Sequence, residues 1–129
     1  RYEIIERDEV MYEEFMMDDA DYCVVAFGIA SRIAKNAIME ARAKGIKVGM
    51  IRPITLWPFP KDALKKAASK VKAFLSVELN MGQMVDDVKL AINCSKPVYF
   101  YGRTGGVLMT PEEVLNKLEE IEKGEAKEW

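Results

Sequence analysis

The sequence predicts an α/β fold built on a largely parallel sheet. From residue 22 onward, short β-branched apolar runs alternate with segments whose apolar residues recur every three to four positions, a pattern typical of consecutive βαβ units. The length of 129 residues, half of them apolar, suits one domain with one core. Helix caps and stop residues separate the segments and place the elements in order.

The first βα unit begins with a strand over Tyr22–Phe27. This run is continuous and β-branched, as expected of a central strand buried on both faces, and Gly28 ends it. A helix follows to about Lys44, with Ser31 as its N-cap and Gly45 as its stop. Its expected apolar face comprises Ile33, Ala37, Ile38 and Ala41.

Two more units follow in the middle of the chain. A strand over Ile46–Ile51 is closed by Pro53, because proline cannot donate to a central ladder. The alanine-rich segment Lys61–Val71 predicts a short helix, and Ala73–Val77 predicts the next strand. The intervening segment Thr55–Pro60 is a proline-broken aromatic loop.

Capping signals mark the last two helices. Asn80 and Gln83 have capping-box spacing, so a helix is expected to begin there, and the last strand follows over Pro97–Tyr101. Thr110, followed by Pro111 and two glutamates, is the strongest local signal in the chain and predicts the final helix. The inward residues expected on these helices are Met84, Val85, Val88 and Ile92, then Val114, Leu115, Leu118 and Ile121.

The two ends of the chain carry fewer local signals than the segments between them. We expect residues 1–20 to be a connector, with Tyr2–Ile5 as a possible edge strand and Glu9–Met17 as a helical turn or connector. The domain proper then covers residues 21–122, and the charged tail 123–129 frays. Because the chain begins at Arg1 rather than at a methionine, we expect it to be a fragment of a longer protein.

The missing residue types exclude several kinds of active site. The chain has no histidine, which excludes serine and cysteine triads, HExxH zinc sites and an imidazole base. The only cysteines, Cys23 and Cys94, are far apart in the sequence, so we expect no CxxC pair and no iron-sulfur or zinc site within this chain.

Charge and hydropathy exclude two classes of partner. A net charge of −2 offers no basic surplus for nucleic acid. The longest apolar stretch, residues 22–30, is far below the ~20 residues that a helix needs to cross a bilayer. We therefore expect a soluble cytoplasmic protein without a nucleic acid or membrane partner.

Candidate site residues follow from the predicted sheet, because ligands of open parallel sheets bind beyond the carboxyl ends of the strands, where the winding reverses. The residues expected there are Gly28, Ser31, Arg52, Glu78, Asn80, Gly102 and Arg103. Two arginines can clamp a carboxylate or phosphate with the help of helix N-terminal amides. The reading that the residues favour is that Glu78 neutralises Arg52 or Arg103 in a buried or interfacial pair.

The predicted loops favour contacts with the core or with another protein over nucleotide binding. Trp57 and Phe59 lie on a stiff proline-rich loop, where large aromatics either cap the core or form a docking patch for another protein. The glycine turns Gly28–Ser31 and Gly102–Gly106 lack the GxGxxG and GK[ST] patterns of nucleotide sites. The residues alone therefore predict an α/β domain with no self-contained active site.

Several strings in the chain point to a known family. The specific ones are IRPITLWPFP over Ile51–Pro60 and VELNMGQM over Val77–Met84. More permissive ones are Asp18–Asp21 leading into VVAFG, the turn Gly45–Val48, and GRTGG over Gly102–Gly106. Over nearly its whole length the chain resembles the C-terminal part of the alpha subunit of 2-oxoacid:ferredoxin oxidoreductases, in particular the 2-oxoglutarate type.

The resemblance implies a transketolase C-terminal-like fold: a three-layer α/β/α sandwich around a five-stranded, mostly parallel mixed sheet with one antiparallel strand. Whole enzymes of this family oxidatively decarboxylate a 2-oxoacid to an acyl-CoA and reduce ferredoxin. They use thiamine diphosphate, Mg²⁺, iron-sulfur clusters and CoA. Their thiamine site lies between the pyrimidine- and diphosphate-binding domains, so the resemblance implies that this chain binds none of these groups.

The implied role is a non-catalytic structural and subunit-interface domain. Its partners would be the preceding pyrimidine-binding domain of the alpha subunit and the beta subunit, with gamma or delta subunits where the enzyme has them. No catalytic residue carries over to this chain. We expect an interface cluster comprising Arg52, Trp57, Phe59, Glu78 and Asn80.

Two alternatives stay open at this point. The chain is a stand-alone α/β interaction or anion-binding module, or it is the equivalent domain of another thiamine diphosphate enzyme, such as a transketolase or a 2-oxoacid dehydrogenase component.

Overall fold

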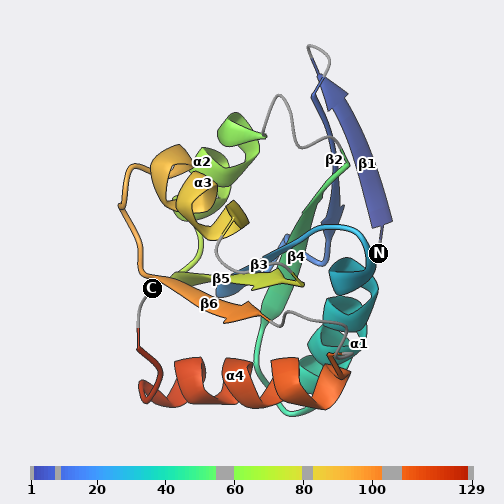
Figure 1. Cartoon of the computed structure of the whole chain (residues 1–129), viewed down its shortest axis with the longest axis vertical. Coiled ribbons are helices and arrows are strands. Elements are labelled where there is room, and N and C mark those ends of the chain that lie inside the picture. The colour runs from blue at the N-terminus through green and yellow to red at the C-terminus, as the bar shows by residue number, and fades with distance from the viewer. Residues whose placement is uncertain (1, 8–9, 55–59, 80–82, 103–108, 128–129) are drawn as a thin grey trace.

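The computed structural model describes residues 2–7, 10–54, 60–79, 83–102 and 109–127. These residues form a six-stranded sheet with helices on both faces (Figure 1). The strands are β1 (Tyr2–Arg7), β2 (Val10–Phe15), β3 (Tyr22–Ala26), β4 (Val48–Pro53), β5 (Ala73–Glu78) and β6 (Val98–Gly102). The helices are α1 (Ile29–Ala43), α2 (Lys61–Ala68), α3 (Gln83–Ala91) and α4 (Pro111–Lys123).

The sheet is mixed and mostly parallel, with the strand order β1-β2-β4-β3-β5-β6. The strands β4, β3, β5 and β6 run parallel to one another, whereas β2 is antiparallel to its neighbours β4 and β1. Among the described strands, β2 alone therefore runs against the others. The α/β class and the mostly parallel mixed sheet are confirmed, but the sheet has six strands where five were predicted.

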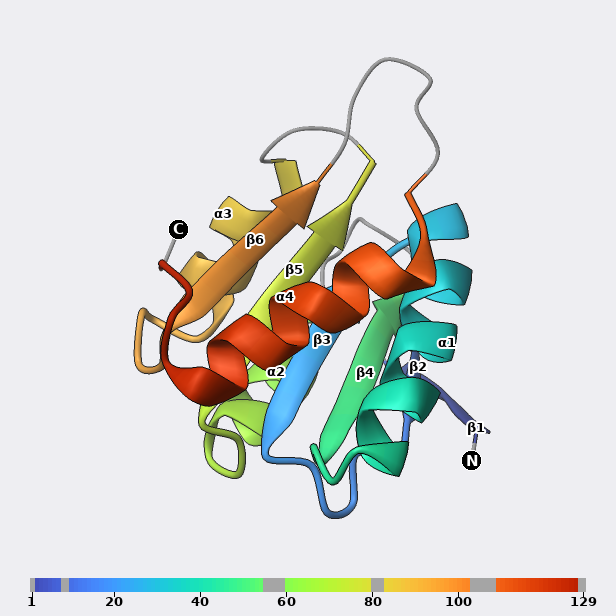
Figure 2. The same ribbon diagram turned by 90° about the horizontal axis from the view of Figure 1, so that it is seen from below.

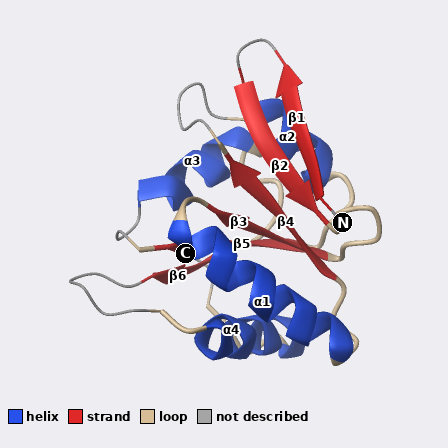
Figure 3. Cartoon of the chain, turned by 90° about the vertical axis from the view of Figure 1, so that its right-hand side faces the viewer, coloured by secondary structure: helices blue, strands red, loops and turns tan. Residues whose placement is uncertain are grey.

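The additional strand is β2, and it replaces the helical turn or connector predicted for Glu9–Met17. That prediction was wrong because a charged residue occupies an inward position of the strand. Glu13 and Phe15 are both buried, whereas the residue between them is only half-buried, so the burial has the period of two of a strand. Figure 3 shows β1, the predicted edge strand, paired with β2 as a hairpin beyond β4.

Different helix pairs cover the two faces of the sheet. The helices α1 and α4 pack on one face, and α2 and α3 pack on the other (Figure 2). The sheet divides the apolar interior into two clusters where one core was expected: Val24 belongs to the cluster beneath α1 and α4, and Val25 to the cluster beneath α2 and α3. Both valines are fully buried, which confirms that β3 is a central strand covered on both faces.

The turn from β3 into α1 depends on Gly28, whose φ of 64° is a conformation that glycine adopts without strain. Ser31 was predicted as the N-cap of this helix, but the structure places it in the first turn. Its hydroxyl donates to the Gly28 carbonyl oxygen over 2.6 Å. The prediction failed because a glycine at positive φ turns the chain within one residue, so α1 begins at Ile29.

The capping box of α4 is confirmed. Thr110 Oγ1 accepts a hydrogen bond from Glu113 N (3.3 Å), and Glu113 Oε2 accepts one from Thr110 N (3.1 Å). All four residues predicted for the inward stripe of α4 are buried. In α3, Val85 and Val88 are buried as predicted, while the capping box proposed at Asn80 lies outside the described residues.

The predicted division at residue 20 and the frayed tail from residue 123 stay predictions, although β1 and β2 belong to the same sheet as the rest. Within the described ranges, none of the helices combines the length and the apolar character that spanning a bilayer requires.

Candidate functional site

The carboxyl ends of β3 and β4 form a crevice. The strand β3 leads into α1 on one face of the sheet, whereas the chain after β4 leads to α2 on the other face (Figures 1 and 2). Neighbouring strands whose connections diverge in this way leave room for a ligand between them. A cavity of about 490 Å³ lies at this point. It is lined by Glu13, Gly28, Ile29, Ser31, Arg32, Lys35 and Arg52.

Glu13 is the one acid in the described lining of this cavity, and only 4% of its side chain is exposed. Its Oε1 atom lies 3.2 Å from Arg52 Nε and 3.3 Å from Lys35 Nζ. Glu13 and Arg52 are directly opposite each other in the antiparallel pairing of β2 with β4. A single buried carboxylate from an edge hairpin therefore holds one cation from β4 and one from α1.

The two cations that α1 contributes to the cavity, Lys35 and Arg32, differ in their surroundings. Lys35 and Arg32 lie three residues apart on α1 and so on neighbouring positions of its surface. Burial, followed by the positive charge of Arg52, holds the pKa of Lys35 below its usual value. The Lys35 ammonium also lies 5.8 Å from the centroid of the Phe15 ring. Arg32 is exposed, and it forms no ion pair with the described residues.

Glu78, at the carboxyl end of β5, makes a separate set of contacts. Its Oε2 atom accepts hydrogen bonds from Ser76 Oγ (3.0 Å) and from Val85 N (2.9 Å). The residue is buried, and it joins β5 to the first turn of α3. The sequence predicted that Glu78 pairs with Arg52 or Arg103. Among the described residues, Arg52 pairs instead with Glu13, which lies directly opposite it across the strand pair. Arg103 lies outside the described residues, so that alternative stays a prediction.

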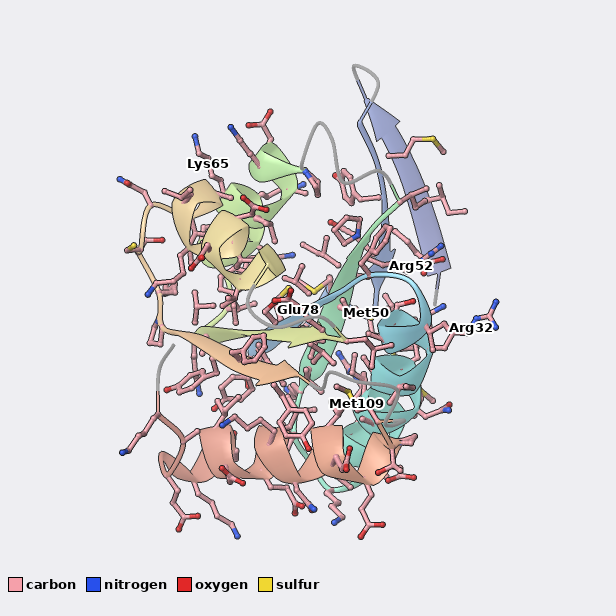
Figure 4. The ribbon with its side chains drawn as sticks, in the orientation of Figure 1. Arg32, Met50, Arg52, Lys65, Glu78 and Met109 are labelled. Atoms are coloured by element: carbon pink, nitrogen blue, oxygen red, sulfur yellow. The ribbon has the colours of Figure 1, made fainter. Side chains whose placement is uncertain are left out.

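The structure brings three of the predicted candidates, Gly28, Ser31 and Arg52, to one cavity. Figure 4 shows that Arg52 and Glu78 come from different strands, β4 and β5, which are separated by β3. Gly102 is the last residue of β6. The remaining candidates, Trp57, Phe59, Asn80 and Arg103, lie outside the described residues, so the predicted interface cluster stays a prediction.

The described residues contain no group of three or more acids and cysteines placed to hold a metal ion. Cys23 is fully buried, and this burial raises the pKa of its thiol, while Cys94 is exposed; neither forms a disulfide. An iron-sulfur cluster needs about four cysteine thiolates, so these two cysteines do not fit one. The cavity does not fit Mg²⁺ either, because its one carboxylate already holds two cations.

The fold and the cavity can now be compared with known proteins. Residues 20–114 match the family model described as pyruvate:ferredoxin oxidoreductase core domain II. The chain belongs to this family. The resemblance to 2-oxoacid:ferredoxin oxidoreductases that the strings indicated is thereby confirmed, whereas their 2-oxoglutarate type stays a prediction.

Two curated relatives of this core domain II are subunits of 2-oxoacid oxidoreductases. The ketoisovalerate oxidoreductase subunit VorB of Methanothermobacter marburgensis is 46% identical over 94% of the chain and 34% of its own length. The 2-oxoglutarate synthase subunit KorA of the same organism is 34% identical over 87% of the chain and 30% of its own length. The chain spans about a third of the length of these relatives.

Solved structures support the fold of the core domain II. The 2-oxoglutarate:ferredoxin oxidoreductase from Magnetococcus marinus matches with a TM-score of 0.66 and 21% identity over 93% of this chain and 19% of that one. A split gene transketolase, described as an inactive beta4 tetramer, matches with a TM-score of 0.68 and 20% identity over 80% of this chain and 38% of that one. The predicted transketolase-like α/β fold is confirmed.

Sequence reasoning missed three charged residues of this core domain II that line the cavity: Glu13, Arg32 and Lys35. A signal for the two cations was present, because Ser31, Arg32 and Lys35 fall on adjoining positions at the start of a helix whose first turn has no acid. Glu13 carried no comparable signal, because its role depends on the pairing of β2 with β4.

Proposed function

We propose that this chain is the non-catalytic structural and subunit-interface domain of the alpha subunit of a 2-oxoacid:ferredoxin oxidoreductase. The complete enzyme oxidatively decarboxylates a 2-oxoacid to an acyl-CoA and reduces ferredoxin. Membership of the core domain II family supports this assignment, as do relatives that are named as subunits of such oxidoreductases.

The observation that carries the interface role is an exposed apolar pair at the carboxyl edge of the sheet. The side chains of β3 are fully buried from Cys23 to Ala26, yet the residues just beyond, Phe27 and Ile29, are 41% and 61% exposed. Apolar side chains grouped on a surface mark contacts with other proteins. We expect the interface to include Trp57 and Phe59 as well, which lie outside the described residues. Its partners would be the preceding pyrimidine-binding domain and the beta, gamma or delta subunits.

The substrate that we propose first is ketoisovalerate, because the VorB relative shares more identity with this chain than the KorA relative does, 46% against 34%. The second is 2-oxoglutarate, the substrate implied by the specific sequence strings. Thiamine diphosphate, Mg²⁺, iron-sulfur clusters and CoA belong to the complete enzyme in this proposal, and the chain itself holds none of them. The setting is the cytoplasm, with ferredoxin as the electron acceptor of the complete enzyme.

Subunit assembly tests the interface. The double variant Phe27→Asp/Ile29→Asp in the complete alpha subunit should abolish co-purification of the partner subunits, because two charges would be buried at the contact. The matched control is Met39→Asp/Leu90→Asp, since these residues are 53% and 76% exposed elsewhere on α1 and α3. Equal assembly of both double variants, with unchanged circular dichroism, would contradict the proposed interface.

Turnover tests the substrate. The assembled enzyme should reduce a viologen dye faster with ketoisovalerate than with 2-oxoglutarate, while the isolated chain should reduce none with either acid. A preference for 2-oxoglutarate would select the second substrate, and no 2-oxoacid-dependent reduction by the assembled enzyme would overturn the assignment.

A further inference from the structure

The strand β1 forms an open edge of the sheet. Its one neighbour is β2, and none of the other described strands pairs with its outer edge (Figure 3). Proline and β-bulges block further pairing at an edge, but β1 contains no proline and pairs with β2 in one unbroken register. The backbone N–H and C=O groups along its outer edge can therefore pair with another strand.

The charged residues of β1 suit one particular strand, which is a second copy of β1. Glu3 and Arg7 are placed symmetrically about Ile5 in the sequence. When two copies pair antiparallel with Ile5 on the two-fold axis, each Glu3 is directly opposite Arg7 of the second copy, which is favourable. A shift of one residue would instead set Glu3 opposite Glu6 of the second copy, and like charges directly opposite are unfavourable. The charges thus select the register that is centred on Ile5.

The exposed residue Ile4 lies beside this axis. Its side chain is 62% exposed, and it is directly opposite Glu13 in the pairing of β1 with β2. Because Glu13 contacts Lys35 of α1, Ile4 lies on the α1 face of the sheet. In the register centred on Ile5, the two copies of Ile4 are diagonal neighbours, about 7–8 Å apart. Pairing would therefore remove from water an apolar side chain that the single chain leaves exposed.

We propose that β1 is a dimerisation strand, which pairs antiparallel with β1 of a second copy of this chain and continues the sheet across a two-fold axis at Ile5. A second copy fits better than an unrelated strand, because the same six residues supply both halves of the charge-complementary arrangement. Neither the interface at Phe27 and Ile29 nor the proposed reaction is needed for this inference.

Sedimentation equilibrium of the complete polypeptide that contains this chain, at low ionic strength, tests the proposal. We expect a reversible monomer–dimer equilibrium. The variants Arg7→Glu and Glu3→Arg should each raise its dissociation constant at least about tenfold, because each replaces two attractive pairs by two repulsive ones. The double variant Glu3→Arg/Arg7→Glu restores opposite charges at both pairs and should return the constant to within about threefold of the parent.

The matched controls are Lys66→Glu and Asp62→Arg on α2. These residues are exposed and have the same four-residue spacing, but α2 packs on a face of the sheet rather than at its outer edge (Figure 2). Each control changes the net charge as its counterpart on β1 does, and it should leave the dissociation constant within about twofold of the parent. Circular dichroism of every variant should match that of the parent.

Three results would overturn the proposal. They are a parent that stays monomeric, single β1 variants that associate as the parent or no worse than the controls, and a double variant that stays as weak as the single ones. None of these results would affect the assembly test above, because that test depends on Phe27 and Ile29.

Discussion

Glu13 occupies an inward position of β2 where an apolar side chain would ordinarily pack. It is buried, and its Oε1 atom contacts both Arg52 and Lys35. Replacing it by an uncharged side chain would remove the carboxylate that both cations contact. The loss should be smaller than the roughly 3–5 kcal/mol typical of a fully buried pair, because the side chains of Arg52 and Lys35 are 29% and 18% exposed.

We therefore expect Glu13→Gln to lower the free energy of unfolding by about 2 kcal/mol, measured by urea denaturation and circular dichroism. The matched control is Glu14→Gln, the next residue along β2, which is only half-buried and should change stability by less than about 0.5 kcal/mol. Equal effects of the two substitutions would show that the ion pairs at Glu13 contribute nothing to stability.

The sequence could predict only those residues of the candidate site that their immediate neighbours in the chain mark. Gly28 and Arg52 were found because each follows or ends a strand that the sequence shows clearly. The partner of Arg52 could not be found in this way, because cross-strand pairing brings together residues 39 positions apart. Glu78 is also acidic and lies at a strand end, so the sequence favoured it as the partner of Arg52 or Arg103; the structure shows hydrogen bonds to Glu78 from Ser76 and Val85.

At the scale of elements, the contact between β3 and α4 contains a titratable group. Tyr22, the first residue of β3, packs against the cluster beneath α1 and α4. Burial, followed by the neighbouring Glu122 carboxylate, raises the pKa of Tyr22 to about 12 from an ordinary value of 10.0. A raised pKa means that the folded state favours the neutral phenol, so this contribution to stability is complete below pH 10 and is lost as the pH rises toward 12.

The variant Tyr22→Phe should accordingly lose less stability than the parent chain between pH 9 and pH 12, in a series of urea denaturation curves. Lysine side chains also titrate in this range, so the measured quantity is the difference between the two chains. Parallel stability curves for Tyr22→Phe and the parent chain would contradict the assigned shift.

The elements themselves differ in how far local signals specify them. The start and the buried stripe of α4 were predicted because its cap, its proline and its apolar residues all lie within one segment. The strand β2 was not predicted, because its charged inward residue breaks the alternation of apolar and polar residues by which strands are recognised. That residue is accommodated through contacts with β4 and α1. The start of α1 was misplaced by three residues, from an N-cap at Ser31 to one at Gly28, because a backbone conformation at Gly28 rather than a side chain makes the turn.

At the scale of the whole molecule, the end of β2 and the segment that follows it contribute to both apolar clusters of the sandwich. Phe15 belongs to the cluster beneath α1 and α4, while Met17 and Ala20 belong to the cluster beneath α2 and α3. All three side chains are buried. The strand count differed from the prediction for this reason: β2 is attached through tertiary contacts, which the pattern of residues 1–20 does not reveal.

Truncation from the N-terminus tests how much of the hairpin the fold needs. Removing residues 1–20 deletes the apolar burial of Phe15 and Met17, each worth roughly 1.5–3 kcal/mol, together with the Glu13 ion pairs. The summed loss, on the order of 5 kcal/mol, is comparable with the whole stability of a typical domain, so we expect the remaining chain not to unfold cooperatively. Removing residues 1–9 deletes only the edge strand β1 and should leave a cooperative transition. Equally cooperative unfolding of both truncated chains would place the domain boundary at residue 20, as the sequence alone predicts.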